Sequence, residues 1–324
     1  MGEFDLISRF FTRPATHAVL GVGDDCALLQ PAAGMQLAIS SDMLVEGRHF
    51  LSTVDPFKLG HKALAVNLSD LAACGARPLA FTLALALPQA DEAWLAPFSR
   101  GLLALADAHG CELVGGDTTR GPLNICITVF GEVPRGQALL RSGARDGDDL
   151  WVSGTLGDAR LALEVFRGTL AAPAEVFEQA RARMEQPTPR VALGQALRGI
   201  ATAAVDISDG LLGDLGHVLQ ASGAGAMIDT SLAIHLIASS ENPAWPAGQF
   251  SLEKKLEFVL AGGDDYELAF TAPPTARNSV MAASAQAHTR VTRIGRIEAD
   301  AGIRLMDAHG APVQGRFGAF DHFG

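Results

Sequence analysis

The stretch AVNLSDLAACGARP, residues 65–78, predicts the buried helix around which we expect the chain to fold. Apolar residues recur with helical spacing, so they share one face that packs inward. They are Leu64, Leu68, Leu71 and Ala72. Asp55-Pro56 is a typical helix start, with a capping side chain followed by proline at the first helical position. We expect this helix to end at Gly75.

Asp70 lies in the middle of this helix, among small and apolar residues. A carboxylate beside an apolar stripe is costly unless lysine, arginine or a metal ion holds it. Five further stretches place aspartate among small and apolar residues in the same way, namely GVGDDCA (21–27), SSDMLVEG (40–47), GGDTTRG (115–121), VDISDGLLGD (205–214) and GGDDYEL (262–268). We expect all six to converge on one anionic ligand through divalent metals.

The chain of 324 residues is long enough for two domains, each with its own core. The composition turns polar and glycine-rich at SGARDGDD (142–149), so the predicted domains are 1–140 and 141–324. The predicted fold class is α+β or mixed α/β. Predicted helices are 3–12, 55–75, 91–109, 157–168, 174–185, 190–200, 209–221 and 252–261, with one more between the last two strands. Predicted strands are 35–41, 79–87, 112–116, 123–133, 150–153, 203–206, 226–229, 267–271 and 290–297.

The formal net charge of −11 argues against a nucleic-acid or membrane surface as partner. It also constrains a phosphate-binding site, because two unit charges about 4 Å apart repel by about 4 kcal/mol at an effective dielectric of about 20. Only four lysines are present: Lys58, Lys62, Lys254 and Lys255. Metal ions are therefore the expected neutralisers.

The four cysteines show no C-x-x-C pairing, which indicates reduced thiols rather than a zinc site or a disulfide framework. The start of the sequence, MGEFDLISRFF, lacks the basic-then-apolar order of a secretion signal. No apolar run approaches the roughly 18 residues of a membrane span. We therefore expect a cytoplasmic protein without a membrane partner.

Each acidic motif also has a plain structural interpretation. Asp117 follows a predicted strand in a Gly-Gly-Asp sequence that is usually only a turn. Asp209 is placed to cap a helix, although capping does not explain Asp206 three residues earlier. A carboxylate pair with that spacing suits Mg²⁺, which commonly bridges to substrate phosphates. Taken singly, Asp24 and Asp25 suit a turn. Ser40 and Ser41 suit a strand end, and His49, in a predicted loop, suits a structural or surface role.

Several enzyme classes are excluded because their motifs are absent. No G-x-x-x-x-G-K-[ST] loop, no H-R-D or D-F-G set and no Ser-His or Cys-His arrangement occurs. GGDDYEL is similar to the GGDEF-type signature of diguanylate cyclases, and its flanks could form a hairpin. A cyclase domain would leave the other five acidic stretches without a role, which disfavours this alternative.

Taken together and in order, these stretches resemble the thiamine-monophosphate kinase family. This family belongs to the superfamily of aminoimidazole ribonucleotide synthetase and selenophosphate synthetase. The resemblance runs from residue 2 to residue 323 and rests on the following motifs: GVGDDCALL (21–29), KALAVNLSDLAACGA (62–76), GGDTTRGPL (115–123), RSGA (141–144), DISDGLLGDLGH (206–217) and GGDDYEL (262–268). It implies two domains of the aminoimidazole ribonucleotide synthetase type, with dimerisation through strands of the N-terminal domain. It also implies phosphorylation of thiamine monophosphate by ATP with several Mg²⁺ ions.

The resemblance also implies roles for individual residues. The metal ligands would be Asp24, Ser40, Ser41, Asp42, Asp70, Asp117, Asp206 and Asp209. ATP would contact Gly116, Asp117, Arg141 and Ser208, and the thiamine phosphate would contact His49, Asp264 and Phe320. We assign the catalytic work to Asp70, Asp117, Asp206 and Asp209. Asp264 stands where the family commonly has Glu, and Phe320 where it commonly has Tyr or Trp.

The chemistry of a phosphate acceptor agrees with the lack of an obvious general base. A phosphate monoester has a second pKa near 6, so its oxygen is already anionic at neutral pH. We therefore expect direct in-line transfer without a phosphoenzyme. Two alternatives stay open: another ATP-dependent phosphotransferase or synthetase of the same superfamily, and a non-catalytic sensor of nucleotides or thiamine phosphates.

Overall fold

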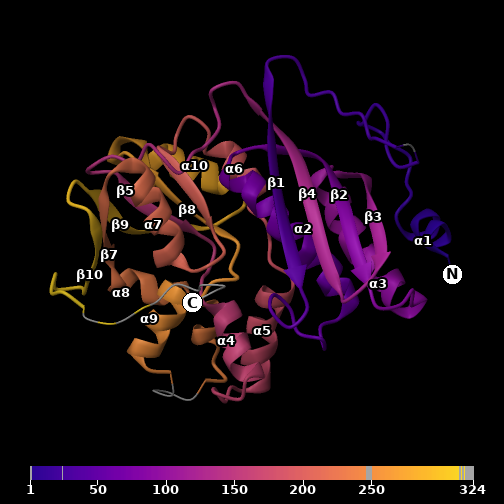
Figure 1. The fold of residues 1–324 in the computed structure, drawn as a ribbon. Helices are drawn as coiled ribbons and strands as arrows, with labels where there is room; N and C mark the ends of the chain where they lie inside the picture. The colour runs from indigo at the N-terminus through magenta and orange to yellow at the C-terminus, as the bar shows by residue number, and fades with distance from the viewer. Residues whose placement is uncertain (1, 24, 246–249, 314, 316, 318–324) are drawn as a thin grey trace. The chain divides into compact units, whose positions relative to one another are not determined.

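The structure is a computed structural model that describes residues 2–23, 25–245, 250–313, 315 and 317. The chain divides into two compact units. The N-terminal unit comprises Met1–Leu71 and Ala76–Ala138, and the C-terminal unit comprises Ala72–Gly75 and Leu139–Gly324. Each unit is built on its own β-sheet (Figure 1).

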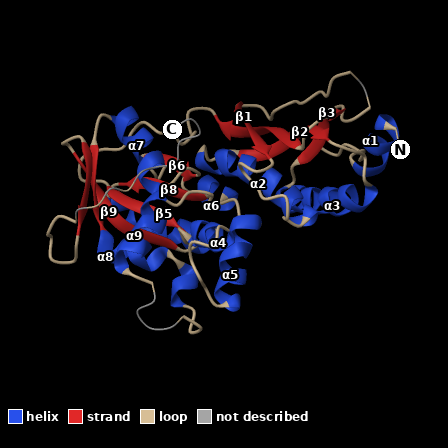
Figure 2. Ribbon diagram, turned by 60° about the horizontal axis from the view of Figure 1, so that its bottom comes forward, coloured by secondary structure: helices blue, strands red, loops and turns tan. Residues whose placement is uncertain are grey.

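The N-terminal unit contains a four-stranded sheet in the order β1-β4-β2-β3. The strands β2 and β3 are parallel, and the other pairs are antiparallel. Its elements are α1 (Glu3–Phe10), β1 (Met35–Val45), α2 (Pro56–Ala73), β2 (Arg77–Leu87), α3 (Glu92–His109), β3 (Glu112–Arg120) and β4 (Asn124–Pro134). Figure 2 shows α2 and α3 on the same face of this sheet.

Helix α2 forms the core of the N-terminal unit, as the sequence predicts. Its predicted inward residues Leu64, Leu68, Leu71 and Ala72 are at most 1 % exposed. Asp55 caps its start by accepting a hydrogen bond from the Phe57 N–H at 2.8 Å. Gly75 has a φ of 70° just beyond its end, the left-handed conformation typical of a residue that follows a helix. The predicted bounds of α2 are therefore confirmed to within two residues.

Glycines allow α2 and α3 to approach closely. A Cβ added at Gly101 would lie 1.8 Å from the Phe57 carbonyl oxygen, and one at Gly60 would lie 2.1 Å from the Phe98 carbonyl oxygen. No other residue fits at either position without moving the backbone of the facing helix. This contact holds α2 in a fixed position under the sheet.

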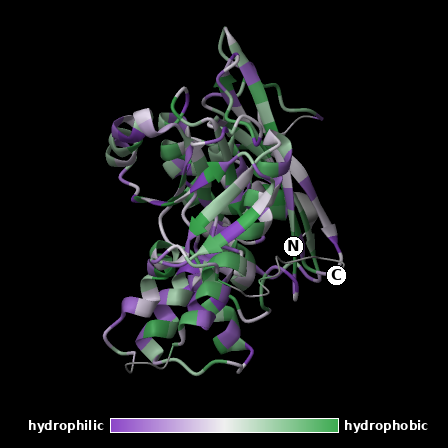
Figure 3. Ribbon diagram, turned by 90° about the vertical axis from the view of Figure 1, so that its left-hand side faces the viewer, coloured by the Kyte–Doolittle hydropathy of each residue, from purple (hydrophilic) through white to green (hydrophobic). Residues whose placement is uncertain are grey.

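The C-terminal unit contains a six-stranded sheet in the order β10-β7-β9-β5-β8-β6. Its strands are β5 (Asp149–Ser153), β6 (Ala203–Ile207), β7 (Gly225–Asp229), β8 (Glu267–Ala272), β9 (Val291–Glu298) and β10 (Gly302–Met306). Its α-helices are α4 (Asp158–Phe166), α5 (Ala174–Glu185), α6 (Val191–Ala196), α7 (Leu211–Ser222), α8 (Thr230–Ala233), α9 (Leu252–Ala261) and α10 (Arg277–Gln286). Short 3₁₀ turns lie at Ile234–Leu236, Ala238–Glu241 and Pro274–Ala276. Figure 3 shows apolar and polar residues alternating along the helices, the pattern of helices with one buried face.

Several predicted elements differ from the structure. Strand β1 continues to Val45, so Asp42 lies within a strand and not at its end. Strand β3 runs through GGDTTR to Arg120, where the sequence suggested a turn. Helix α6 covers only Val191–Ala196 of the predicted 190–200, and β10 was not predicted. The segment before GGDDYEL is helix α9, so the hairpin expected of the cyclase alternative is absent from these described residues.

Candidate active site

Asp70 lies where α2 meets β1. The Ser40 hydroxyl donates a hydrogen bond to the Asp70 carboxylate. One turn of the helix earlier, the Asn67 Oδ1 accepts a hydrogen bond from the Asp42 N–H at 3.0 Å, while its Nδ2 donates to the Ala63 carbonyl at 3.0 Å. Asn67 is 1 % exposed. These contacts fix β1 to α2 and bring Ser40, Asp42 and Asp70 close together.

Ser41 does not join this group through its hydroxyl. Successive side chains of a strand point to opposite faces, and Ser40 and Asp42 lie on the side of α2. The Ser41 hydroxyl instead lies 3.0 Å from the Thr128 hydroxyl and donates to the Ile127 carbonyl at 3.1 Å, both on β4. Of the three consecutive residues predicted as ligands, Ser40 and Asp42 lie on the face of the sheet that α2 covers, and Ser41 lies on the opposite face.

His49 closes the turn that follows β1. Its ring Nδ1 accepts a hydrogen bond from the Val45 N–H at 3.0 Å, and the backbone N–H of His49 donates to the Val45 carbonyl at 3.0 Å. An accepting Nδ1 fixes the tautomer, so the neutral ring carries its proton on Nε2. His49 is half-buried.

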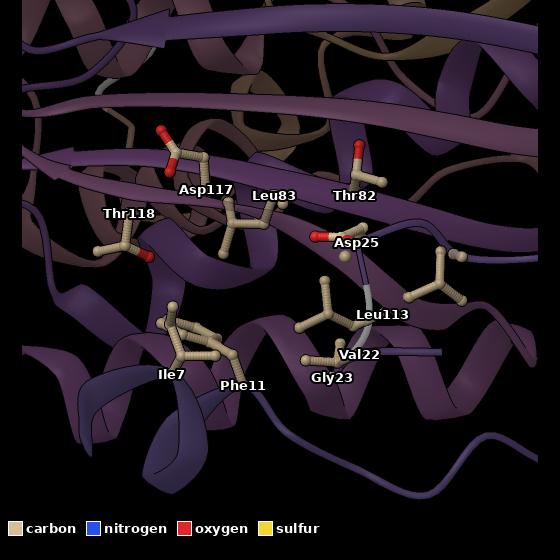
Figure 4. A pocket seen from close by; sticks show the side chains of 14 residues that line it. Ile7, Phe11, Val22, Gly23, Asp25, Thr82, Leu83, Leu113, Asp117 and Thr118 are labelled. Atoms are coloured by element: carbon tan, nitrogen blue, oxygen red, sulfur yellow. The ribbon is translucent and has the colours of Figure 1, made fainter. Parts of the chain in front are cut away.

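Gly116 and Asp117 line a cavity of about 600 Å³ in the N-terminal unit. Figure 4 shows Ile7 of α1 and Phe11, the residue that follows this helix, on one side of the cavity and Asp117 with Thr82 on the other. The remaining lining residues come from the loop after α1 and from β2 and β3: Val22, Gly23, Asp25, Ala27, Leu83, Leu113, Val114, Gly115 and Thr118. The cavity thus combines an apolar floor with glycine backbone and two carboxylates.

The two groups of the N-terminal unit lie at opposite edges of its sheet. Asp42 pairs with Ile127, which is level with Leu83, and Leu83 pairs with Gly116. Neighbouring strands are about 4.8 Å apart, so β1 and β3 are separated by about 14 Å. Within one chain, Asp117 therefore does not share a metal ion with Asp42. The predicted convergence of all the aspartates on one ligand stays a prediction.

Glu112 anchors the segment that leads into the cavity wall. Its carboxylate accepts hydrogen bonds from the backbone N–H groups of Thr16, His17 and Ala18 at 2.8–2.9 Å and from the Thr16 hydroxyl. Burial opposes ionisation, but these donors outweigh it and lower the pKa of Glu112 to about 2. The anchored chain continues through the Leu20–Leu28 bridge, which encloses the GVGDDCA motif.

In the C-terminal unit, Asp206, Ser208 and Asp209 lie where β6 turns into α7. Asp206 is 5 % exposed near the end of the strand. The interpretation of Asp209 as a helix cap is wrong, because the N-cap of α7 is Gly210, with a φ of 112°. Asp209 precedes the cap and stands beside Ser208 in the turn.

Asp214 holds this turn from inside the unit. Its Oδ2 accepts hydrogen bonds from the N–H groups of Ser208 and Asp209, both at 3.0 Å. Asp214 is 4 % exposed, and burial raises its pKa to about 6. A carboxylate with so little access to water is held there by the N–H donors of the turn.

The GGDDYEL loop packs against the same turn. The Asp264 N–H donates to the Ser208 carbonyl at 2.7 Å, and the Tyr266 N–H donates to the Ile207 carbonyl at 2.9 Å. Asp264 and Tyr266 have φ values of 62° and 53°, a conformation that residues other than glycine rarely adopt. Asp264, Ser208 and Asp209, which are far apart in the sequence, therefore meet at one corner of the C-terminal unit.

Two buried carboxylates support this loop from beneath. Asp265 accepts from the Gly157 N–H at the start of α4, and burial raises the pKa of Asp265 well above its usual value. Glu267 is fully buried and accepts from the Ser153 hydroxyl and from the guanidinium groups of Arg183 and Arg190. Along the loop, the residues with left-handed backbone, Asp264 and Tyr266, thus alternate with Asp265 and Glu267, whose side chains are held by hydrogen bonds.

Arg141 is exposed and does not meet this corner within the C-terminal unit. Its carbonyl accepts a hydrogen bond from the Ser222 hydroxyl, which lies at the C-terminal end of α7. Ser208 lies in the turn before the N-terminal end of the same helix. Twelve residues of helix span about 18 Å. The contacts of Arg141 and Ser208 with ATP stay predictions.

Asp24 and Phe320 lie outside the described residues. Among the residues that are described, no group of three or more His, Cys, Asp or Glu side chains is arranged to hold a metal ion. In the same part of the chain, none of the helices combines the length and the hydropathy needed to cross a bilayer.

Sequence reasoning missed three residues that build these groups: Asn67, Glu112 and Asp214. Asn67 is a polar residue on a buried stretch of α2, three positions before Asp70, and this spacing places both on one side of the helix. Asp214 is an acidic residue in the first turn of α7, where a carboxylate binds free N–H groups. Glu112 carried no comparable signal, because its partners lie about 95 residues earlier in the sequence.

Comparison with known proteins gives the family. The models of the AIR synthase related protein match the chain over residues 23–133 (N-terminal domain) and 145–308 (C-terminal domain). The thiamine-monophosphate kinase of Escherichia coli K12 is 45 % identical over 326 residues, which cover 99 % of this chain and 98 % of that protein. The chain belongs to the thiamine-monophosphate kinase family. The resemblance drawn from the sequence motifs is thereby confirmed.

Solved structures of thiamine-monophosphate kinases share the fold. The enzyme from Stenotrophomonas maltophilia K279a matches with a TM-score of 0.82 and 45 % identity, covering 93 % of this chain and 94 % of that one. AaThiL complexed with AMPPCP and TMP matches with a TM-score of 0.75 and 29 % identity, covering 91 % and 89 %. The predicted mixed α/β fold of two AIR synthase related domains is confirmed.

Proposed function

We propose that this chain transfers the γ-phosphoryl group of ATP to thiamine monophosphate, giving thiamine diphosphate and ADP. One observation carries the proposal: motif residues distant in the sequence, Ser208, Asp209 and Asp264, meet at one corner of the C-terminal unit. These residues belong to the motifs on which the resemblance to the thiamine-monophosphate kinase family rests, and the Escherichia coli K12 member of that family matches 99 % of this chain.

The reaction needs charge neutralisation more than proton transfer. The acceptor is a phosphate oxygen that is already anionic at neutral pH, so this chain need not provide a general base. Its task is to hold two phosphate groups in line while they repel each other. We therefore propose direct in-line transfer, in which the phosphoryl group passes from ATP to the acceptor in a single displacement.

The residues fit magnesium by the chemistry of their donor atoms. Ser40, Asp42 and Asp70 in one unit and Asp206 with Asp209 in the other supply hard oxygen ligands. Mg²⁺ is usually bound by one or two carboxylates together with substrate phosphates, so a cage of three carboxylates is not needed. When bound, several Mg²⁺ ions would neutralise the charge that develops on the transferred phosphoryl group.

The nucleotide and the acceptor have separate candidate contacts. In the N-terminal unit, the cavity beside Gly116 and Asp117 offers close backbone approach and an apolar wall, as a nucleotide requires. For the acceptor, the His49 Nε2–H can donate to a phosphate oxygen. Asp264 offers a carboxylate to the cationic thiazolium ring or to the amino group of the pyrimidine.

We also propose that the chain works as a homodimer in the cytoplasm. Leu37, Ile39 and Met43 alternate along β1 and are 45–60 % exposed on the sheet face opposite α2. A row of large apolar side chains on an uncovered sheet face is typical of an interface. All four cysteines are free thiols, as in proteins of a reducing compartment.

One assay tests the function against its alternatives. The protein is incubated with ATP, Mg²⁺ and thiamine monophosphate, and the products are separated by chromatography. Formation of ADP and thiamine diphosphate in equal amounts is expected. Binding of both ligands without turnover would favour a sensor, and ATP consumption only with another acceptor would favour a different phosphotransferase or synthetase. With chiral γ-phosphoryl ATP, net retention at phosphorus would contradict direct transfer.

A further inference from the structure

The backbone of the turn between β6 and α7 is hydrogen-bonded on two sides. On one side, the N–H groups of Ser208 and Asp209 both donate to a single oxygen of Asp214 at 3.0 Å. On the other side, the carbonyl groups of Ile207 and Ser208 accept from the backbone of the GGDDYEL loop at 2.9 and 2.7 Å. No freedom is left for the peptide between Ser208 and Asp209 to rotate without breaking bonds on both sides.

The GGDDYEL loop packs closely against this turn. A Cβ added at Gly263 would lie 2.7 Å from the Ser208 carbonyl oxygen. Asp264 and Tyr266 are held in left-handed conformations that persist only where the surroundings fix them. The orientation of Asp264 is therefore set by the position of the turn, and the position of the turn is set by its contact with Asp214.

We propose that Asp214 is the positioning residue that couples Asp209 to Asp264, so that the metal-binding turn and the acceptor-binding loop are aligned as one element. This inference rests on the proposed function for the roles of Asp209 and Asp264. Asp214 is 4 % exposed and lies behind the turn, so it acts through the backbone and not by touching substrate.

The physical basis is the difference between a charged and a neutral acceptor. A carboxylate oxygen that accepts two N–H groups holds them about twice as strongly as a neutral amide oxygen does. Asp214→Asn keeps the size of the side chain and one acceptor, so the turn can form but is held less firmly. Loss of such an outer partner typically costs about 10- to 100-fold in metal affinity or activity.

The test compares Asp214→Asn with two controls in the full chain. Asp149→Asn removes another carboxylate of the C-terminal unit, 3 % exposed and bound to Arg277 and Arg293, and so reports general destabilisation. Gln220→Ala alters the exposed end of the same helix. The readouts are the melting temperature, Mn²⁺ binding followed by the EPR signal of the free ion, and kcat and KM for thiamine monophosphate.

The single tyrosine of the chain supplies a reporter that does not depend on activity. Tyr266 lies in the coupled loop, so fluorotyrosine labelling gives one ¹⁹F resonance from the loop itself. In Asp214→Asn we expect this resonance to shift or broaden, Mn²⁺ to bind about tenfold more weakly, and kcat to fall about tenfold. In Asp149→Asn we expect a lower melting temperature with the other quantities unchanged.

The proposal is overturned if Asp214→Asn leaves the ¹⁹F resonance and Mn²⁺ affinity as in the wild type, or if Asp149→Asn changes both to the same extent. If Asp214→Asn fails to fold, Asp214→Glu, which keeps the charge, must restore folding and the wild-type resonance for the proposal to stand. If the wild-type chain does not phosphorylate thiamine monophosphate but the spectroscopic changes occur, the proposed function fails and the coupling remains.

Discussion

The Ser40 hydroxyl of β1 donates a hydrogen bond to the Asp70 carboxylate of α2, and so joins two elements separated by 30 residues. The carboxylate beside the buried stripe of α2 thus has a neutral hydroxyl donor as one of its partners. A hydroxyl donor orients a carboxylate without bringing a positive charge to it.

Replacing Asp70 tests its proposed role as a metal ligand. Asp70→Asn should lower kcat at least about 10²-fold, equivalent to about 2.7 kcal/mol of transition-state stabilisation, because the amide binds a divalent cation poorly. The melting temperature should stay close to that of the wild type, since an amide also accepts the Ser40 bond. Asp107→Asn, an exposed carboxylate of the same unit, is the matched control. Near-normal turnover of Asp70→Asn would remove Asp70 from the site.

Arg141→Ala should weaken ATP binding more than it slows turnover. A guanidinium group matches the geometry of phosphate oxygens, and Arg141 is exposed on the RSGA loop. We expect KM for ATP to rise about tenfold, because one charge-assisted contact contributes roughly 1.5 kcal/mol. Arg145→Ala, an exposed arginine four residues further along, should leave KM unchanged. An unaltered ATP dependence in Arg141→Ala would refute the assignment.

The Glu112 anchor predicts a pH-dependent difference in stability. The pKa of Glu112 is lowered to about 2 in the folded chain, against about 4.3 in an unfolded one. Its stabilising effect is therefore fully present above about pH 4.3 and is lost as the pH falls toward 2. Glu112→Gln should melt at a lower temperature than the wild type at neutral pH, and the difference should shrink as the pH falls below about 4.3. A difference that is constant with pH would show that the charge of Glu112 does not matter.

Thiol labelling reports on the cavity in the N-terminal unit. Cys26 is exposed between Asp25 and Ala27, which line the cavity, whereas burial raises the pKa of the Cys111 thiol to about 12. Because the thiolate is the reactive form, a thiol reagent at about pH 8 should modify Cys26 long before Cys111. Saturating Mg-ATP should slow the modification of Cys26 several-fold. Peptide mapping by mass spectrometry identifies the residue, and labelling unaffected by ATP would place the nucleotide elsewhere.

The proposed dimer interface can be disrupted at one position. Ile39 is 60 % exposed on β1, and Ile39→Asp would put a charge into the apolar face. Light scattering coupled to size exclusion should show a dimer for the wild type and a monomer for this variant at micromolar concentration. Leu252→Asp, at a residue 59 % exposed on α9, is the matched control and should remain dimeric. A monomeric wild type would refute the proposal outright.

Local sequence signals predicted the elements that obey simple rules. The apolar spacing of Leu64, Leu68 and Leu71 and the cap at Asp55 predicted α2 almost to its ends, because a buried helix records its face in the sequence. The glycines of GGDTTRG suggested a turn, and that prediction was wrong. In the structure, a Cβ at Gly116 would lie 1.9 Å from the Leu83 carbonyl oxygen. Glycine is needed there for close approach of β2 and β3, and the strand continues.

The grouping of the site residues could be predicted only in part. Ser208 and Asp209 are neighbours in the sequence, so their proximity needed no fold. The meeting of Asp264 with Ser208 follows from the antiparallel pairing of β6 with β8, which no local pattern records. Likewise, the separation of Asp42 from Asp117 by the width of a sheet depends on the strand order, which is set by the tertiary fold.

The left-handed backbone at residue 264 also restricts which amino acids can occupy it. Aspartate and asparagine tolerate this region better than residues with longer or branched side chains. Aspartate, the shorter of the two acids, is thus accommodated by the local chain geometry with less steric cost than glutamate would be. Substitution by valine or isoleucine would be disfavoured by conformation alone, whatever the new side chain did to the chemistry.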